Sequence, residues 1–208
     1  MTNELNDELA TFFLQDARDY LERFSHLKEK STDRSRRSKL LVDLLFSLEC
    51  ILKALAFIES KENEKATYKK IRTHDFEKII QTLTEQSKMK CREHISPGLT
   101  EYYVEIRYSL ESHIRFRTEE GILGSQYYST IGDFSWLQKV SENAKALLKY
   151  AETQVKTPAI KDVRFCDIDI KKSIERHRRI REIKEANKAL EPTIMAVTPP
   201  AALASRQP

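Results

Sequence analysis

Two residue types that can act on a phosphodiester, arginine and histidine, occur close together in the middle of the chain. Arg107 and His113 have five residues between them. Cleavage of RNA by its own 2′-hydroxyl needs a base of near-neutral pKa, which histidine supplies, and a cation for the crowded phosphate, which arginine supplies. Such a reaction needs no metal ion. On a continuous helix the two side chains would lie about 120° apart, so the site needs a helix break between them or a facing protomer.

Ordinary structural roles compete with these chemical interpretations. Arg107 can pair with a nearby carboxylate, and His113 can be solvated. His74 and Asp75, neighbours at an expected helix start, could be a general base and the carboxylate that orients it. Capping of the helix is the more ordinary role there. His94 follows Cys91 at a spacing that allows a metal on a helix, but two ligands do not make a site. We therefore expect no metal and no cofactor.

The strongest electrostatic feature is the C-terminal segment KKSIERHRRIREIKEANK. Residues 168–190 hold eight Lys or Arg and four Asp or Glu, an excess that equals the net charge of +4 of the whole chain. A helix of this composition can pack through its isoleucines and present a basic face to phosphates, whereas a solvated face with internal ion pairs is the alternative. The residues predicted to contact RNA or a nucleotide here are Lys171, Lys172, Arg176, Arg178, Arg179 and Arg181, and Arg115 and Arg117 extend the same footprint.

Apolar residues at three- and four-residue steps predict an all-α protein. The chain has 208 residues but only four glycines, which argues against a many-stranded sandwich or barrel. We expect helices over residues 5–27, 40–57, 76–83, 99–110 and 133–155, and a basic helix over 169–190. Residues 28–39 are expected to form a basic loop and residues 61–72 a charged connector, with Thr73 as the cap of the third helix. Residues 109–129 fit a helix end, a loop or an extended arm.

Missing motifs exclude several classes of protein. No P-loop, GxGxxG, HExxH or GxSxG pattern occurs, so an ATPase, a dehydrogenase, a zinc protease and an α/β-hydrolase are unsupported. Three widely spaced cysteines with no CxxC pair do not support a disulfide framework or a zinc ribbon. Acidic residues near the first methionine and charge-broken apolar stretches predict neither a secretory signal nor a membrane span, so we expect a cytoplasmic protein.

Four segments occur in a distinctive order between residues 38 and 155. They are SLECILKALAFIES, which contains Glu49 and Lys53, then THDFEKIIQTL, then YYVEIRYSLES, and finally the helix from Leu137 to Tyr150. This ordered set resembles the HEPN family of helical domains associated with nucleotides and RNA. The resemblance depends more on the order of the elements than on any single motif.

The resemblance implies an up-and-down bundle of four to five helices that forms a homodimer and engages RNA or a nucleotide. Many HEPN members are metal-independent ribonucleases whose Arg and His are separated by four to six residues. By this resemblance Arg107 would stabilise the phosphate and His113 would be the acid and base, while His74 would contact the nucleotide or RNA. Other members lack the pair and bind a nucleotide or a partner, often a nucleotidyltransferase. Tyr108, directly after Arg107, is more like that branch.

The leading hypothesis is a HEPN-like RNA-directed protein, whose catalytic form would be a metal-independent ribonuclease effector of a microbial toxin–antitoxin or defence system. The alternatives are a non-catalytic nucleotide- or partner-binding module and a helical adaptor that docks an acidic partner through its basic helix. The expected organisation is a HEPN-like bundle over residues 1–157, a linker with the basic helix over 158–190, and a disordered Pro- and Ala-rich tail over 191–208.

Overall fold

The computed structural model describes residues 4–96, 99, 102, 106, 108–155 and 170–188. In this part of the chain the regular structure is helical, with one isolated antiparallel bridge between Arg117 and Leu123 and no strand. The all-α class is therefore confirmed, while the number of bundle helices and the expected domain boundaries stay predictions. By its internal contacts the chain divides into two compact units, residues 1–162 and 163–208, which are described separately.

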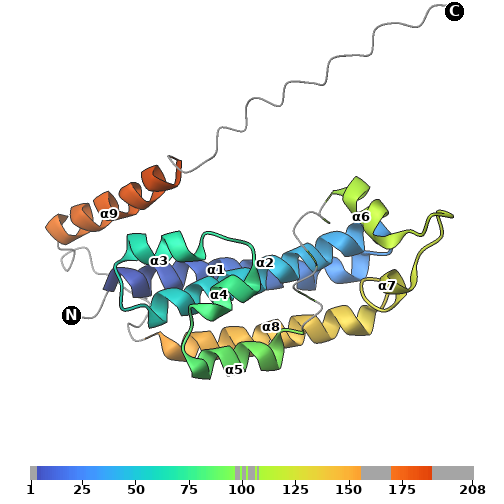
Figure 1. Cartoon of the computed structure of the whole chain (residues 1–208), viewed down its shortest axis with the longest axis horizontal. Helices are drawn as coiled ribbons and strands as arrows, with labels where there is room; N and C mark the ends of the chain where they lie inside the picture. Colours follow the sequence, from blue (N-terminus) through green and yellow to red (C-terminus); the bar gives the residue numbers. More distant parts are fainter. Residues whose placement is uncertain are drawn as a thin grey trace, which may run out of the picture. The chain divides into compact units, whose positions relative to one another are not determined.

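Three long helices form the body of the first unit: α1 (Glu4–Leu27), α2 (Arg34–Glu59) and α8 (Phe134–Gln154). Each packs against the other two, and α1 and α2 lie side by side along most of their length (Figure 1). The short segment 28–33, with the 3-10 turn Lys28–Lys30, makes α1 and α2 antiparallel neighbours. Because α2 is covered on several sides, it buries residues around most of its circumference, including the consecutive residues Leu40, Leu41 and Val42.

Shorter helices cover α2 and α8: α3 (Glu64–Ile71), α4 (Phe76–Gln81) and α5 (Glu85–His94). The expected connector over residues 61–72 is wrong, because α3 occupies most of it. Asn63 caps α3 by accepting a hydrogen bond from the backbone N–H of Ala66 at 2.9 Å. The expected cap Thr73 is also wrong, because Asp75 caps α4. A short helix with few buried residues carries too little apolar periodicity to be recognised from sequence.

The start of α2 differs from expectation as well. Residues 34–39 were expected in a loop, but α2 begins at Arg34, where the side chain of Asp33 accepts a hydrogen bond from the N–H of Arg36 at 2.9 Å. Charged residues are compatible with an exposed first turn, so hydrophobic periodicity does not reveal it. As a consequence the basic residues of this segment have fixed positions on a helix.

The region that sequence left open contains α6 (Ser109–Phe116) and α7 (Ser125–Tyr128). The helix expected over residues 99–110 does not continue to Leu110, because Tyr108 has extended backbone (φ −90°, ψ 144°) and precedes α6 as its N-cap. After α6 the chain reverses at Gly121, whose φ of 74° favours glycine. The N–H of Gly124 then bonds the carbonyl of Phe116 at 3.0 Å.

The second unit contains α9 (Ile170–Lys188), whose bounds agree closely with the basic helix expected over residues 169–190. The tail expected over residues 191–208 lies outside the described residues. Within the described part of the chain, no helix combines the length and the apolar character that crossing a membrane requires.

Candidate functional site

His113 on α6 contacts an arginine, although not the one that the sequence predicted. Nη2 of Arg34, in the first turn of α2, lies 3.1 Å from Nδ1 of His113. A guanidinium can only donate, so Nδ1 accepts, and the imidazole in this contact carries its proton on Nε2. The structure therefore places a cation directly beside an imidazole on the surface of the first unit. Arg34 belongs to the basic segment 28–39, but nothing in the sequence of that segment indicated His113 as the partner of Arg34.

The predicted partner Arg107 lies outside the described residues. Tyr108, with extended backbone, directly precedes α6, so α6 does not extend back beyond Ser109. The hypothesis that Arg107 joins His113 stays a prediction.

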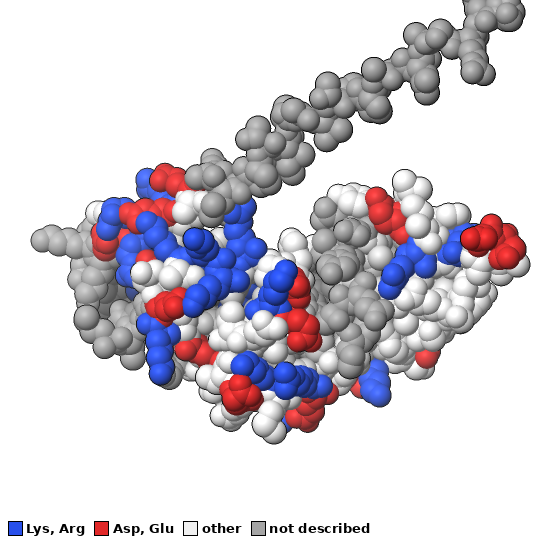
Figure 2. Space-filling model, in the orientation of Figure 1, with Lys and Arg blue, Asp and Glu red and all other residues white. Residues whose placement is uncertain are grey.

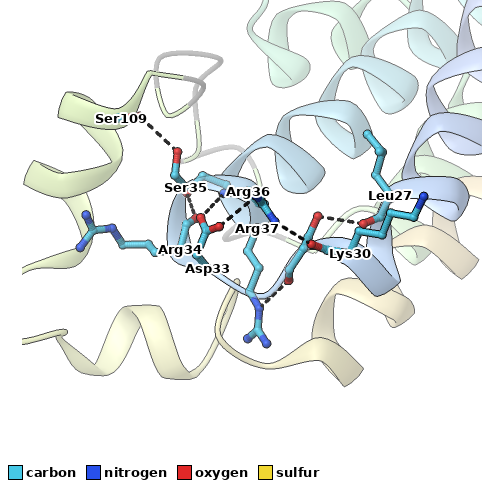
Figure 3. Close-up of polar contacts among 10 residues, drawn as sticks. Leu27, Lys30, Asp33, Arg34, Ser35, Arg36, Arg37 and Ser109 are labelled. Atoms are coloured by element: carbon cyan, nitrogen blue, oxygen red, sulfur yellow. Dashed lines mark hydrogen bonds and ion pairs between the residues drawn. The ribbon is translucent and has the colours of Figure 1, made fainter.

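Two pairs of serine hydroxyls dock α6 onto the first turns of α2. Ser38 Oγ and Ser112 Oγ lie 2.6 Å apart in a buried contact. Ser35 Oγ and Ser109 Oγ lie 3.1 Å apart, as Figure 3 shows. The hydroxyl of Ser38 donates its one proton to the carbonyl of Arg34 at 2.9 Å, so it accepts the hydrogen bond that Ser112 donates. These contacts fix the position of His113, which directly follows Ser112, relative to Arg34.

The same junction leaves two buried polar atoms without hydrogen-bond partners. They are Nε of Arg34 and Oε2 of Glu111. An unsatisfied buried polar atom costs about 1–3 kcal/mol, and such atoms in a folded protein often mark a place that a ligand, an ion or water completes. Arg34 therefore has donor capacity beyond its contact with His113.

The other predicted residues of α6 already have protein partners. The guanidinium of Arg115 lies over the ring of Tyr102, 5.3 Å from its centroid, and Arg117 donates to the carbonyl of Gly121. Nearby, the buried rings of Phe116 and Tyr127 meet edge to face at 6.1 Å, so these two aromatics pack between elements. Arg115 and Arg117 contribute positive charge near His113, since all three lie on or at the end of one helix.

His74 belongs to a different polar cluster, which joins the first two segments of the HEPN resemblance. Its Nδ1 lies 2.8 Å from Oε2 of Glu49, and Oε1 of the same carboxylate lies 2.6 Å from Nζ of Lys53. The Glu49 side chain is 8% exposed, whereas that of His74 is 60% exposed. A carboxylate that holds Nδ1–H leaves Nε2 able to accept a proton or a hydrogen bond. Its neighbour Asp75 caps α4.

The described cysteines do not supply a nucleophile. Burial raises the pKa of the Cys50 and Cys91 thiols to about 12, so both stay protonated at neutral pH. Cys166 lies outside the described residues. Within the described part of the chain, no three His, Cys, Asp or Glu side chains gather in a way that would hold a metal ion.

The basic helix α9 carries part of its charge in internal ion pairs. Arg178 lies 2.5 Å from carboxylate oxygens of both Glu175 and Glu182. Arg176, Arg179 and Arg181 lie on the same helix, as do Lys171 and Lys172, whose side chains are outside the described part. Figure 2 shows basic and acidic side chains intermixed over the described surface in view. Recognition of an anion would therefore depend on local groups more than on the modest net charge of +4.

No family model matches this chain, and neither a curated protein nor a solved structure matches it. The likeness to HEPN domains rests on the four quoted segments.

Proposed function

We propose that this chain is a HEPN-like, RNA-directed protein that cleaves RNA without a metal ion. The observation that carries the proposal is the 3.1 Å contact between Arg34 and His113 at the junction of α2 and α6. In this proposal His113 is the acid and base, Arg34 binds the phosphate, and Arg107 is a further cation. The role in a toxin–antitoxin or defence system is proposed from the resemblance alone.

The proposed reaction begins when a phosphate takes the place of His113 as the acceptor for Arg34. This exchange frees Nδ1 of His113 to remove the proton from the 2′-hydroxyl, and the 2′-oxygen attacks phosphorus. The bond from phosphorus to the 5′-oxygen breaks, and the proton passes from the imidazolium to that oxygen. The products are a 2′,3′-cyclic phosphate and a 5′-hydroxyl, while the guanidinium stabilises the charge on the phosphate oxygens.

An exposed apolar strip beside His113 supports a protein partner at the same place, and we propose a second copy of the chain. Leu110 and Ile114 share one face of α6 and are 66% and 69% exposed. Tyr108, just before α6, is 53% exposed. Exposed apolar groups that gather on one face are typical of protein contact sites. A homodimer through α6 would bring two Arg34–His113 pairs together.

A second candidate is a non-catalytic module that binds a nucleotide or a partner such as a nucleotidyltransferase. The cluster of Glu49, Lys53 and His74 favours it, because an exposed imidazole held by a buried carboxylate can recognise a polar ligand without any reaction. In either candidate the basic face of α9 would help to hold RNA, or would dock an acidic partner.

The test is cleavage of a mixed RNA pool by the full chain in EDTA. We expect His113→Ala to lower the cleavage rate about 10²- to 10⁴-fold, which is the usual contribution of a general acid or base. Arg34→Ala should lower the rate about 10²- to 10³-fold, since it removes a donor to the developing charge. Arg107→Ala tests the arginine that the sequence predicted.

His94→Ala is the matched control, because the substitution also removes an imidazole, but from a different helix, α5. Cleavage that persists in EDTA and is lost in the His113 and Arg34 variants, but not in the control, supports the proposal. A pure, folded protein that leaves the RNA intact would instead favour the binding module.

A further inference from the structure

A pocket lies where the end of α1 and the following turn meet the first turns of α2. Its volume is about 350 Å³, within the range of sites for small organic ligands. One wall comes from Leu27 and Lys30. The other wall is one face of α2, with residues at helical spacing: Arg36, Lys39, Leu40 and Asp43.

The charges around this pocket do not cancel. Arg36 pairs with Asp33 at 3.1 Å, and Asp43 pairs with Arg23 of α1, whose Nε lies 3.0 Å from its Oδ2. Lys30 and Lys39 are both exposed and have no ion pair within the described residues. The pocket therefore has two uncompensated positive charges.

Two positive charges match one phosphate monoester, which carries about −1.5 to −2 charges at neutral pH. A phosphodiester carries only one negative charge and would leave one lysine unmatched. The pocket also has an apolar part, since Leu40 is buried beneath it and Leu27 at its edge is 43% exposed. An apolar surface beside the cations suits the organic part of a nucleotide better than bare phosphate.

We propose that this pocket binds the terminal phosphate monoester of an RNA strand together with its nucleoside. The assignment to RNA rests on the proposed function. Arg34 and Arg36 are two residues apart on α2, so their side chains point about 160° apart. Figure 3 shows Arg34 directed away from the side of the helix that holds Lys30 and Leu27. The end of a strand in the pocket would thus lie across the start of α2 from His113. A free nucleoside monophosphate has the same chemistry, so the experiment includes it.

The experiment measures binding of short 2′-O-methyl RNA to the full chain by fluorescence anisotropy, because such RNA has no 2′-hydroxyl to react. Strands with a 5′-phosphate, a 3′-phosphate or only hydroxyl ends are compared, and unlabelled AMP, adenosine and inorganic phosphate serve as competitors. We expect a terminal phosphate to tighten binding about tenfold, in keeping with charge-assisted hydrogen bonds. Lys30→Gln and Lys39→Gln should each remove most of that preference.

Lys145→Gln is the control, since it removes an exposed lysine of α8 that has no ion pair in the described part of the chain. Equal binding of phosphorylated and hydroxyl strands, with AMP no better than adenosine, overturns the proposal. AMP that competes well while strands show no preference overturns the RNA end as the source and assigns a free nucleotide. Inorganic phosphate that competes as well as AMP overturns the nucleoside part. Cleavage by wild type with no phosphate preference would refute the pocket alone and leave the proposed ribonuclease standing.

Discussion

The buried carboxylate of Glu49 shows how one residue can fix two others. It contacts Lys53 on the next turn of α2 and His74 just before α4, so it joins two elements while it neutralises a lysine that is only 14% exposed. Loss of the negative charge would leave the ammonium of Lys53 without a counterion in a largely dry environment. At the scale of the residue, the contribution of an ion pair to stability depends on burial more than on distance.

We therefore predict that Glu49→Gln lowers the free energy of unfolding by about 3 kcal/mol, the usual effect of removing one partner from a buried ion pair. The matched control is Glu62→Gln. Glu62 lies 2.7 Å from Lys70, but these side chains are 44% and 56% exposed, and loss of a surface pair costs less than about 1 kcal/mol. Urea denaturation of both variants measures the difference. Equal losses would mean that burial does not set the strength of the Glu49 contacts.

At the scale of the element, α6 combines a docked face with an uncovered one. Ser112 and Phe116 face the bundle and are buried, whereas Leu110 and Ile114 are largely exposed. An eight-residue helix is too short to be stable alone in water, so its packing on α2 and on the aromatic cluster holds it. The uncovered apolar face then requires an explanation, and a second copy of the chain is the proposed one.

Ile114→Glu should disrupt that association, because it places a charge on the most exposed residue of the apolar strip. Sedimentation velocity is expected to give a dimer for wild type and a monomer for the variant, with a dissociation constant raised at least about 100-fold, as for an interface hot spot. Met89→Glu is a close control, since Met89 on α5 is 70% exposed, against 69% for Ile114. A wild-type chain that sediments as a monomer at all concentrations would contradict the proposed homodimer.

At the scale of the whole molecule, the net positive charge lies in the segment that contains α9, because residues 168–190 hold eight Lys or Arg and four Asp or Glu. The net charge of +4 is small, and acidic groups neutralise part of α9 internally, as in the contacts of Arg178 with Glu175 and Glu182. Arg181 on the same helix has no ion pair among the residues that the structure describes. Arg178 and Arg181 thus lie on the same helix, but only the guanidinium of Arg181 is not already paired with a carboxylate of the described residues.

If α9 holds RNA, Arg181→Gln should weaken binding and reduce the slope of log affinity against log salt by about 0.7, the value for one phosphate contact on a single strand. Arg178→Gln should leave the slope unchanged, because its guanidinium is already shared by two carboxylates. Salt titrations of RNA binding by the full chain give both slopes. Identical slopes for wild type and both variants would remove α9 from the RNA footprint.

The sequence alone was sufficient for the all-α class and for the long helices α1, α2 and α8. Their apolar residues recur with helical spacing over several turns, and that periodicity survives any detail of packing. The sequence was not sufficient for α3, for the first turn of α2 or for the break at Tyr108. Those features depend on caps and on a few buried contacts, so they leave little periodic signal.

The partners of the candidate residues were decided only by tertiary structure. Arg34 and His113 are 79 residues apart, and Glu49 and His74 are 25 apart. Residue types and local spacing indicated His113 and the basic segment 28–39, because imidazole and guanidinium chemistry is a property of the side chain itself. His74 was indicated by the resemblance to HEPN domains. Which imidazole meets which charge depends on how α6 docks on α2 and how the chain before α4 returns to α2. Such docking is the sum of many small contacts between distant segments, and no local pattern in the sequence encodes it.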